Sequence, residues 1–356
     1  MDKVFTPFVT SFLITIVATP LTIKLARKLD IVDNPLRPHP AHVQNRIVPK
    51  AGGIPIYLSI ILSAFLFLPI TKWLIGIALG GLVLLIVGLW DDLVNNLSPY
   101  PRLLMQFLAA GIVVATGVGI TFTTNPFGGI LRLDQLIWTV NFFGTHNIIV
   151  FADLFALLWI VWMMNMVNWS WGVDGQMPGV IAVSALTIGV LAFNLFLRGD
   201  ANQLPIAQFS VITAASALGF LIFNWHPAKI FPGDSGSNIL GFTIAVLCIL
   251  TSAKLAAALI VLLVPSMDFF YTFFRRVASG QSPFHGDRKH LHHLLLQRGW
   301  SHRGISLFYF GSSILLGLAA ANLGSREKLF TLVGVGTMVL GVILWLHLFY
   351  KRPKPL

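Results

Sequence analysis

Four aspartates stand at the edges of long apolar runs in a chain that carries few charges. Asp91 and Asp92 close one run, Asp174 follows another after a short polar stretch, and Asp234 opens a third. Hard cations such as Mg²⁺ take carboxylate oxygens as ligands, and nearby Lys, Arg and His side chains can bind phosphates. This combination suits phosphoryl transfer, in which catalysis depends mostly on positioning and charge neutralisation. The catalytic acids that we expect are Asp91, Asp92, Asp174 and Asp234.

The adjacent carboxylates lie in "GLWDDLVNNLSPYPRLLMQ", residues 88–106. Neighbouring carboxylates repel each other unless a cation or a shared proton stabilises them, so the pair indicates a metal, a metal-bound phosphate or a shared proton. Arg102, which opens the next apolar run, is the expected counter-charge. The alternative is a solvated loop in which Asp91 and Asp92 cap a helix end.

A single acid, Asp234, lies in "NWHPAKIFPGDSGSNILGF", residues 224–242, just before an apolar run. An aspartate at this place is also an ordinary helix N-cap. Lys229 and His226 precede it, however, and a helix N-terminus adds donors for an anion. We therefore favour an oxygen ligand for Mg²⁺, with substrate phosphates completing the coordination shell.

The most polar stretch is "RRVASGQSPFHGDRKHLHHLLLQRG", residues 275–299. Its histidines, His290, His292 and His293, could suggest zinc, but no thiolate accompanies them and their spacing matches no common zinc pattern. With Arg288 and Lys289 they form a cationic, donor-rich loop suited to a diphosphate. A loop that is basic only because it faces the inner side of a membrane is the alternative reading.

A further basic loop, residues 30–53, contains Asp33, His39, His42, Arg46 and Lys50 and ends in a Gly-Gly pair that permits close backbone approach. We expect this loop to form a wall of the same cavity.

Composition places these motifs in an integral membrane protein. The chain has 356 residues, of which 56% are hydrophobic and 10% charged, and its mean hydropathy is +0.81. The single cysteine, Cys248, lies in an apolar run, which excludes disulfides and cysteine metal sites as organising devices. About eleven runs could span a bilayer: 4–26, 51–70, 73–90, 103–121, 149–168, 179–197, 206–224, 237–253, 255–274, 305–323 and 329–350.

The fold class that we predict is an all-α polytopic membrane protein of about 10–11 transmembrane helices in one domain, residues 1–356. Most Lys and Arg residues fall on one side, which the positive-inside rule makes cytoplasmic, so we expect the N-terminus outside, the C-terminus inside and cytoplasmic active-site loops. The net charge of +11 is then mostly an inner-face charge. Residues 122–148 predict a small hairpin or an amphipathic cover on the outer face.

Five motifs in order, from about Asp33 to Leu296, resemble the polyprenyl-phosphate N-acetylhexosamine-1-phosphate transferases (glycosyltransferase family 4). Gly88–Asp92 resembles the family's GxxDD, "LSPYPRLLMQ" its LSPxxKLLxQ, and "NWHPAKIFPGDSGS" its NxxPAKxFxGDSGS. "NMVNWSWGVDGQMPG", residues 165–179, resembles NxxNxxDGxDGxxxG, and "DRKHLHHLLL" resembles DRxHLHHxLL.

The resemblance implies transfer of a sugar-1-phosphate from a UDP-sugar, such as UDP-GlcNAc, to undecaprenyl phosphate, with release of UMP. This starts lipid-linked glycans such as peptidoglycan, teichoic acid or lipopolysaccharide O-antigen at the cytoplasmic face of the bacterial inner membrane. The implied metal is Mg²⁺, with Mn²⁺ as the alternative, on Asp234 and Asp174. Phe231 is expected to form a shelf for the uracil ring. The implied substrate-binding residues are Lys50, Arg102, Asn165, Asn168, Asn224, Lys229, Phe231, Arg288, His290, His292 and His293.

Three positions depart from the family pattern. Arg102 replaces a lysine, Asn95 stands where a third aspartate often lies, and Trp171 replaces the first aspartate of the DGxDG segment. Trp171 leaves three readings open: the lost acid is dispensable, the tryptophan reshapes the donor pocket, or the enzyme is impaired.

The HLHH motif favours the branch that uses UDP-linked N-acetylhexosamines over the phospho-N-acetylmuramoyl-pentapeptide transferases, which are the alternative. A direct and a covalent aspartyl-phosphate route both remain open. A lipid-linked sugar transporter is disfavoured because transporters place their polar groups near the membrane midplane. An intramembrane aspartyl protease is disfavoured more strongly, and an inactive scaffold remains a further alternative. The expected partners are the UDP-sugar, undecaprenyl phosphate and the bilayer, with no nucleic acid, and a homodimer is an open possibility.

Overall fold

A computed structural model describes residues 2–34, 46–94, 97–124, 129–141, 145–170, 172–251, 255–282, 287 and 289–349. Several residues singled out in the sequence lie outside the described residues: His39, His42, Asn95, Trp171 and Arg288.

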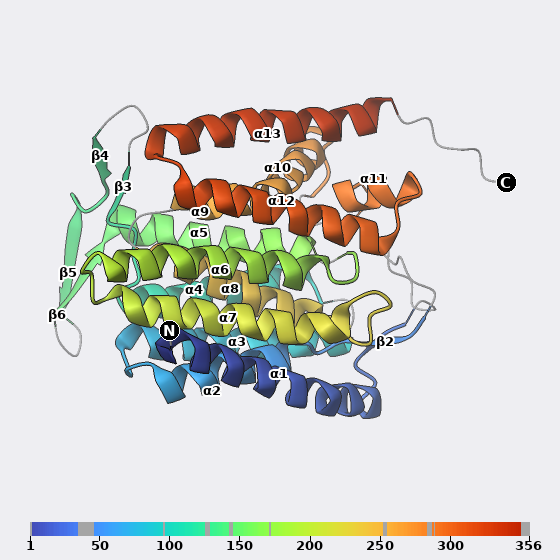
Figure 1. Ribbon diagram of the computed structural model, residues 1–356, viewed down its shortest axis with the longest axis horizontal. Coiled ribbons are helices and arrows are strands. Elements are labelled where there is room, and N and C mark those ends of the chain that lie inside the picture. Colours follow the sequence, from blue (N-terminus) through green and yellow to red (C-terminus); the bar gives the residue numbers. More distant parts are fainter. Residues whose placement is uncertain are drawn as a thin grey trace.

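Helices dominate the described residues, as the apolar runs predict (Figure 1). The helices are α1 (Asp2–Lys28), α2 (Gly53–Phe67), α3 (Lys72–Val94), α4 (Pro99–Ala115), α5 (Val150–Trp169), α6 (Gln176–Leu197), α7 (Gln203–Asn224), α8 (Gly233–Leu250), α9 (Leu255–Val261), α10 (Leu263–Ala278), α11 (Leu291–Gln297), α12 (His302–Asn322) and α13 (Ser325–Leu348).

Each of the eleven predicted runs falls on a helix, but the runs are not all alike. Among the described residues, eight helices are long and apolar enough to cross a membrane, and the bent pair α9–α10 makes up to nine. The helices α2 and α4 have 15 and 17 residues. At about 1.5 Å per residue they are shorter than a hydrocarbon core of about 30 Å. The chain is thus an all-α polytopic membrane protein.

The predicted run 255–274 is broken, which corrects the expectation of a continuous span. Its two helices meet at an angle of 85°. Pro265 provides the reason, because a proline lacks the N–H for the helix ladder and its ring crowds the carbonyl four residues earlier, at Val261. The helix α9 ends at Val261, and α10 leaves in a new direction.

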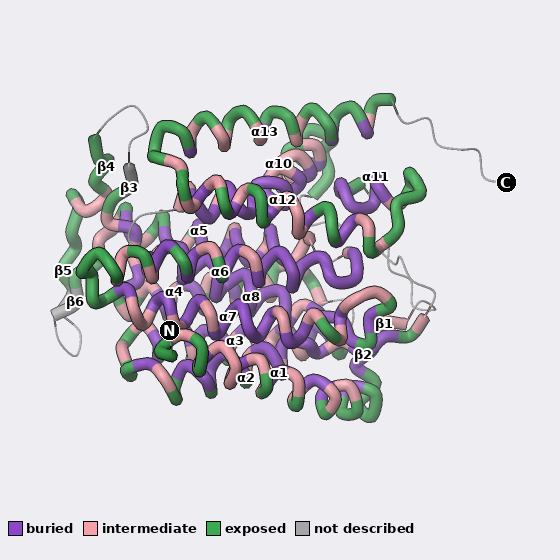
Figure 2. The backbone as a smooth tube through the Cα atoms, viewed as in Figure 1, coloured by how far each residue is buried: buried purple, intermediate pink, exposed green. Residues whose placement is uncertain are grey.

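The helices pack side by side, with α8 inside and α13 at one edge (Figures 1 and 2). In the most apolar 18-residue window of each helix, 83% of the residues are buried in α8 and 17% in α13. The exposed face of α13 carries apolar side chains such as Phe330, Val333 and Met338. A surface of this kind suits lipid.

Small and polar side chains join the first helices. Ser11 of α1 donates to the carbonyl of Ile212 in α7 at 2.8 Å, and Ser59 of α2 donates to Ser216 of α7 at 2.6 Å. Lipid provides no hydrophobic drive between helices, so close packing and such hydrogen bonds, about 0.6 kcal/mol each, hold them together.

Short strands lie at both ends of the bundle (Figure 1). At one end, β3 (Phe122–Thr124) pairs with β4 (Ile130–Arg132), and β5 (Ile137–Asn141) pairs with β6 (Thr145–Ile149), both antiparallel. We refer to the end of the bundle that carries β3, β4, β5 and β6 as the strand end. The sequence predicted a single hairpin or amphipathic cover here, and the structure has two hairpins. At the opposite end, where α11 also lies, β1 (Val32–Asp33) pairs with β2 (Val48–Pro49).

Candidate active site

The end of the bundle opposite the β3–β6 hairpins brings the polar motifs together. Here α3 and α5 finish, α4 and α8 begin, and the β1–β2 pair and α11 lie nearby (Figure 1). The motifs are separated in sequence by up to about two hundred residues and meet only because the helices run antiparallel.

Asp91, Asp92 and Asp234 form what we call the carboxylate cluster. Arg102 Nη1 lies 3.3 Å from Asp91 Oδ2 and 3.3 Å from Asp234 Oδ1, so one guanidinium bridges two acids. The carboxyl groups of Asp91 and Asp234 are also within hydrogen-bonding reach of each other. The predicted pairing of Arg102 with the adjacent acids is thus confirmed for Asp91, and Asp234 joins it.

Asp92 holds the first turn of α8. Its Oδ1 accepts from the backbone N–H of Asp234 at 2.9 Å, and its Oδ2 accepts from the Ser235 hydroxyl at 2.8 Å. Gly233 adopts φ +66, and a Cβ there would lie 2.4 Å from both carboxylate oxygens of Asp92. Glycine is needed at this position for both reasons. Asp92 therefore caps α8 from another helix and fixes the place of Asp234.

A row of amide side chains continues inward from Asp234. Asn168 donates to Asp234 Oδ1 at 2.5 Å, Asn165 donates to Gln106 at 2.7 Å, and Gln106 donates to Asn238 at 2.6 Å. A cavity of about 50 Å³ lies beside them, lined by Pro99, Arg102, Leu103, Gln106, Asn165, Asn168, Trp169 and Asn238. The sequence predicted Asn165 and Asn168, whereas Gln106 and Asn238 were missed although both are amides in apolar runs.

Asp174 has a different set of partners. Its Oδ2 accepts from Ala228 N at 2.9 Å and lies 2.8 Å from His226 Nδ1 and 3.2 Å from Arg46 Nη2. Asn224, also predicted, accepts from Gly175 N at 3.0 Å and so ties the Asp174 turn to the segment that precedes α8.

Two groups of side chains could hold a cation. Among the described residues, Asp174, His226 and His302 have ligand atoms within 4.8 Å of one another. In both groups a guanidinium and an N–H already approach one carboxylate oxygen: Arg46 and Ala228 at Asp174 Oδ2, and Arg102 and Asn168 at Asp234 Oδ1. The carboxylate cluster offers only oxygen ligands and an excess of negative charge, the donor chemistry that Mg²⁺ prefers.

The remaining predicted residues of this region vary in exposure. Phe231 is 6% exposed and packs with Val48 and Ala228, so its ring is covered in this structure. Lys50 lies 3.6 Å from Asp33, and Lys229 is exposed. A shelf role for Phe231 and a phosphate-binding role for Lys229 stay predictions.

The histidine turn, which we define as Lys289–His293, lies against the segment that contains Asp174. A Cβ on Gly172 would lie 2.3 Å from His292 Nε2, so these two predicted motifs are in direct contact. His292 is 1% exposed, and its Nδ1 has no hydrogen-bond partner. Burial lowers the pKa of His292 well below its usual value, and the nearby charges of His293, His290 and His302 lower it further. His292 is therefore neutral at pH 7.

Three residues that support the histidine turn were missed or unassigned in the sequence. Asp268 contacts His290, and Arg276, which is 2% exposed, lies on the other side of the His290 ring. Asp287 is bound by Arg275 and Arg276 at 2.7 and 3.0 Å. Burial by itself would raise the pKa of Asp287, but the hydrogen bonds from the two arginines hold it well below its usual value. The signal for Asp268 was present, because an acid inside an apolar run is a site hypothesis in a membrane protein.

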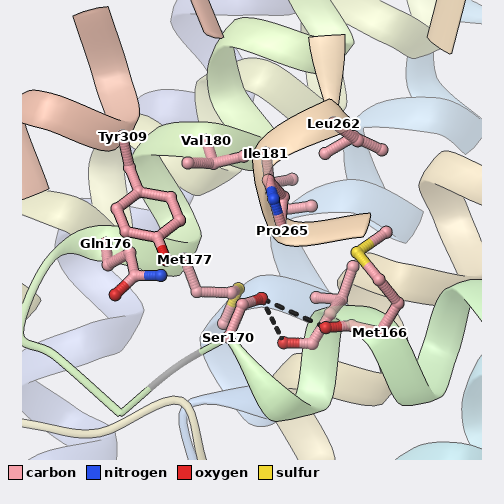
Figure 3. Close-up of a pocket in the computed structure, with 10 residues that line it drawn as sticks. Met166, Ser170, Gln176, Met177, Val180, Ile181, Leu262, Pro265 and Tyr309 are labelled. Atoms are coloured by element: carbon pink, nitrogen blue, oxygen red, sulfur yellow. Dashed lines mark hydrogen bonds between the residues drawn. The ribbon is translucent and has the colours of Figure 1, made fainter. Parts of the chain in front are cut away.

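The bend between α9 and α10 packs against α5, α6 and α12 (Figure 3). Leu262 and Pro265 from the break face the last turns of α5 and the first turns of α6 across a narrow apolar cleft. The cleft is too tight for a water molecule, and it is lined by Met166, Val167, Ser170, Gln176, Met177, Val180, Ile181, Leu262, Pro265 and Tyr309.

Comparison with known proteins gives a consistent result. The model of "Glycosyl transferase family 4" matches residues 74–252. A decaprenyl-phosphate N-acetylglucosaminephosphotransferase of Mycobacterium leprae is 32% identical over 94% of this chain and 86% of its own length. A probable undecaprenyl-phosphate N-acetylglucosaminyl 1-phosphate transferase of Bacillus subtilis is 29% identical, over 91% and 86%. A phospho-N-acetylmuramoyl-pentapeptide-transferase of Geobacillus kaustophilus is 28% identical, over 86% and 94%.

Proposed function

Since the chain belongs to glycosyl transferase family 4, we propose that it transfers an N-acetylhexosamine-1-phosphate from a UDP-sugar to a polyprenyl phosphate and releases UMP. The observation that carries the proposal is the carboxylate cluster, in which one arginine bridges two of three neighbouring acids beside a polar cavity. The acceptor that we propose is undecaprenyl phosphate, in line with the name of the Bacillus subtilis relative, whereas the Mycobacterium leprae relative is named for decaprenyl phosphate.

The residues of the site suggest how each substrate is held. In the reaction, an oxygen of the acceptor phosphate attacks the sugar-bearing phosphorus of the donor. This new P–O bond forms as the bond from that phosphorus to the bridging oxygen breaks, and UMP leaves. Because the oxygens of Asp92 hold α8, Asp91 is the acid that we assign to orient or deprotonate the acceptor phosphate. Phosphates would be clamped by Arg102, Lys229 and His292.

A divalent metal fits the carboxylate cluster. Asp234 would hold Mg²⁺, or Mn²⁺ as the alternative, and Asp174 is the further ligand that the sequence resemblance implies. The ion would neutralise charge that grows on the leaving phosphate. Arg102 bridges Asp91 and Asp234 and so holds these two acids close together.

We place the carboxylate cluster at the cytoplasmic face of the inner membrane. Basic residues gather at its end of the bundle, and they are Lys24, Arg27, Lys28, Arg46, Lys50, Arg102, Lys229, Arg275, Arg276, Lys289, Arg298 and Arg303. The strand end has Lys3, Lys72, Arg132, Arg198, Arg326 and Lys328. The positive-inside rule then makes the site end cytoplasmic.

Two other functions are less well supported by this site. The muramoyl-pentapeptide branch is the runner-up, since one of its members covers most of the chain. A transporter is disfavoured because Asp91, Asp92 and Asp234 lie at the ends of helices rather than within them.

The test is UMP release by purified protein in detergent, with undecaprenyl phosphate, Mg²⁺ and in turn UDP-GlcNAc, UDP-GalNAc or UDP-MurNAc-pentapeptide. Release that requires one donor, the lipid and the metal is the expected result, and the active donor identifies the branch. Omission of the lipid and addition of EDTA are the controls. If folded protein releases no UMP with any of the three donors, the proposal is rejected, and the substitution at Trp171 becomes the first cause to test.

A further inference from the structure

We propose that Asp268 is a positioning residue, which fixes the tautomer of His290 and through it the place of Arg276 beside the histidine turn. The proposal rests on the proposed function for its effect on turnover, but its structural part can be measured without activity. Asp268 lies in α10, beyond the residues that the family model matches.

Asp268 makes two hydrogen bonds to the histidine turn. Its Oδ2 lies 2.9 Å from His290 Nδ1, and its Oδ1 accepts from the backbone N–H of Leu291 at 2.8 Å. The Asp268 side chain is 6% exposed and the His290 side chain 8%, so both contacts are shielded from water. A single carboxylate thus holds the ring of His290 and the first residue of α11.

The opposite nitrogen of the His290 ring determines which tautomer is present. His290 Nε2 lies 3.4 Å from Arg276 Nη2, and a guanidinium can only donate. Nε2 must therefore accept and carry no proton. A ring that carries one proton then has it on Nδ1, which donates to Asp268. Thr272 Oγ1 lies 3.4 Å from the same nitrogen.

This arrangement gives His290 a different role from its neighbours. Both of its ring nitrogens face protein groups, so we assign His290 to link Asp268 with Arg276 rather than to bind phosphate directly. His292, by contrast, has a buried Nδ1 without a partner.

Arg276 connects the histidine turn with the end of α5, which adjoins the carboxylate cluster. Its guanidinium carbon lies 4.7 Å from the ring centroid of Trp169, the last residue of α5. Asn168, next to Trp169, donates to Asp234. The chain of contacts from Asp268 through His290, Arg276 and Trp169 therefore reaches the residue that adjoins the acid site.

An Asp268→Asn substitution separates this role from simple packing. An asparagine whose oxygen accepts from Leu291 N–H must turn its amide N–H groups toward His290 Nδ1. Nδ1 would then have to accept, which moves the proton to Nε2 and points an N–H at the guanidinium of Arg276. The amide has nearly the same shape as the carboxylate, so a packing role alone would leave the tautomer unchanged.

The structural test is ¹⁵N NMR of protein with labelled histidine, in detergent, because the ring nitrogen shifts distinguish the two tautomers. His290 is assigned from the signal that disappears in His290→Asn. We expect an Nδ1–H ring in the wild type and an Nε2–H ring in Asp268→Asn. A wild-type Nε2–H ring, or an unchanged Nδ1–H ring in folded Asp268→Asn, would overturn the proposal.

The kinetic test compares UMP release by the same variants. Loss of an outer partner that orients a functional residue costs about 10–100-fold, which is the fall in kcat/KM that we expect for Asp268→Asn. The double variant with His290→Asn should fall no further than the single one, since both lose the Arg276 contact. Additive losses, or a wild-type rate in Asp268→Asn, would contradict the proposal.

The matched control is Asp153→Asn. Asp153 is an aspartate on α5 at the strand end that accepts from a backbone N–H, of Ile149, at 2.9 Å. It should leave the His290 signal and the rate unchanged. If the wild type itself is inactive with every donor, the proposed function fails, while the NMR result still decides the role of Asp268.

Discussion

The carboxylate cluster and Asp287 differ in how many cationic side chains pair with each acid. At the cluster, Asp91 and Asp234 share one guanidinium, and Lys50, which also attracts Asp92 and Asp234, is paired with Asp33. Asp287 instead has two arginines to itself, at 2.7 and 3.0 Å. The cluster thus lacks positive charge, whereas Asp287 is well supplied with it. We expect the repulsion between the acids of the cluster to cost stability, and we expect the loss of Asp287 to be costly because it would leave buried cationic charge without its partner.

The largest effect should come from Asp234→Asn, which removes the acid that contacts both Arg102 and Asn168. We expect UMP release to fall by about 10³-fold, since the proposed ligand of the ion that neutralises charge on the leaving phosphate is lost. Thermal stability in detergent should stay equal or rise, because repulsion within the cluster is relieved.

Asp153→Asn, at the strand end, is the control and should change neither quantity. Near wild-type turnover of Asp234→Asn would remove Asp234 from the site, and a large loss of stability would reject the contrast with Asp287.

Asp287→Asn, unlike Asp234→Asn, should lower the stability of the protein. It leaves the guanidinium of Arg276, 2% exposed, without its carboxylate partner. Removing one partner of a buried ion pair costs about 3 kcal/mol of unfolding free energy. Thermal and denaturant unfolding in detergent would measure the loss. An unchanged melting temperature would show that the Asp287 pairs contribute little to the fold.

Gly172→Ala tests the contact between the histidine turn and the Asp174 segment. A methyl group would lie 2.3 Å from His292 Nε2, and overpacking of a buried site costs about 2 kcal/mol. We expect slower UMP release together with a lower melting temperature.

Gly111→Ala in α4 is the matched variant, since its methyl would meet nothing within 4 Å. Equal behaviour of the two alanine variants would contradict the packing of His292 on Gly172.

The smallest effect concerns the pH dependence of stability. The folded state lowers the pKa of His292, so the ring stays neutral while an unfolded histidine takes up a proton near pH 6.5. The unfolded state binds more protons below this pH, and stability is lost as the pH falls from 7 to 5, by about 1.4 kcal/mol per pH unit for one proton.

His292→Gln removes this contribution, so the melting temperature of the variant should fall less steeply with acid than that of the wild type. Identical slopes would mean that His292 does not titrate in this way.

Local sequence patterns predicted much of the fold and of the site. The apolar runs placed the membrane helices, and the polar motifs named Asp91, Asp92, Arg102 and Asp234, which the structure brings together. The bend at Leu262 was missed because a proline inside an apolar run is compatible with a straight or a broken span, and the surroundings of the helix determine which forms.

Partnerships between distant residues could not be predicted. The sequence predicts Asp92 as a catalytic acid, but in the structure its carboxylate caps α8. This contact forms because α3 and α8 lie side by side. Asp268 reads as one acid in an apolar run, and its contacts with His290 and Leu291 exist only because α10 turns by 85° at its start.

The sequence by itself determined that this chain spans a membrane and which residue types gather between its helices, since apolar length and scarce charge are local properties. The tertiary structure decided which acid binds which base. A hydrogen bond or an ion pair forms only across a few ångströms, and helix packing sets those distances between residues more than one hundred positions apart in the chain.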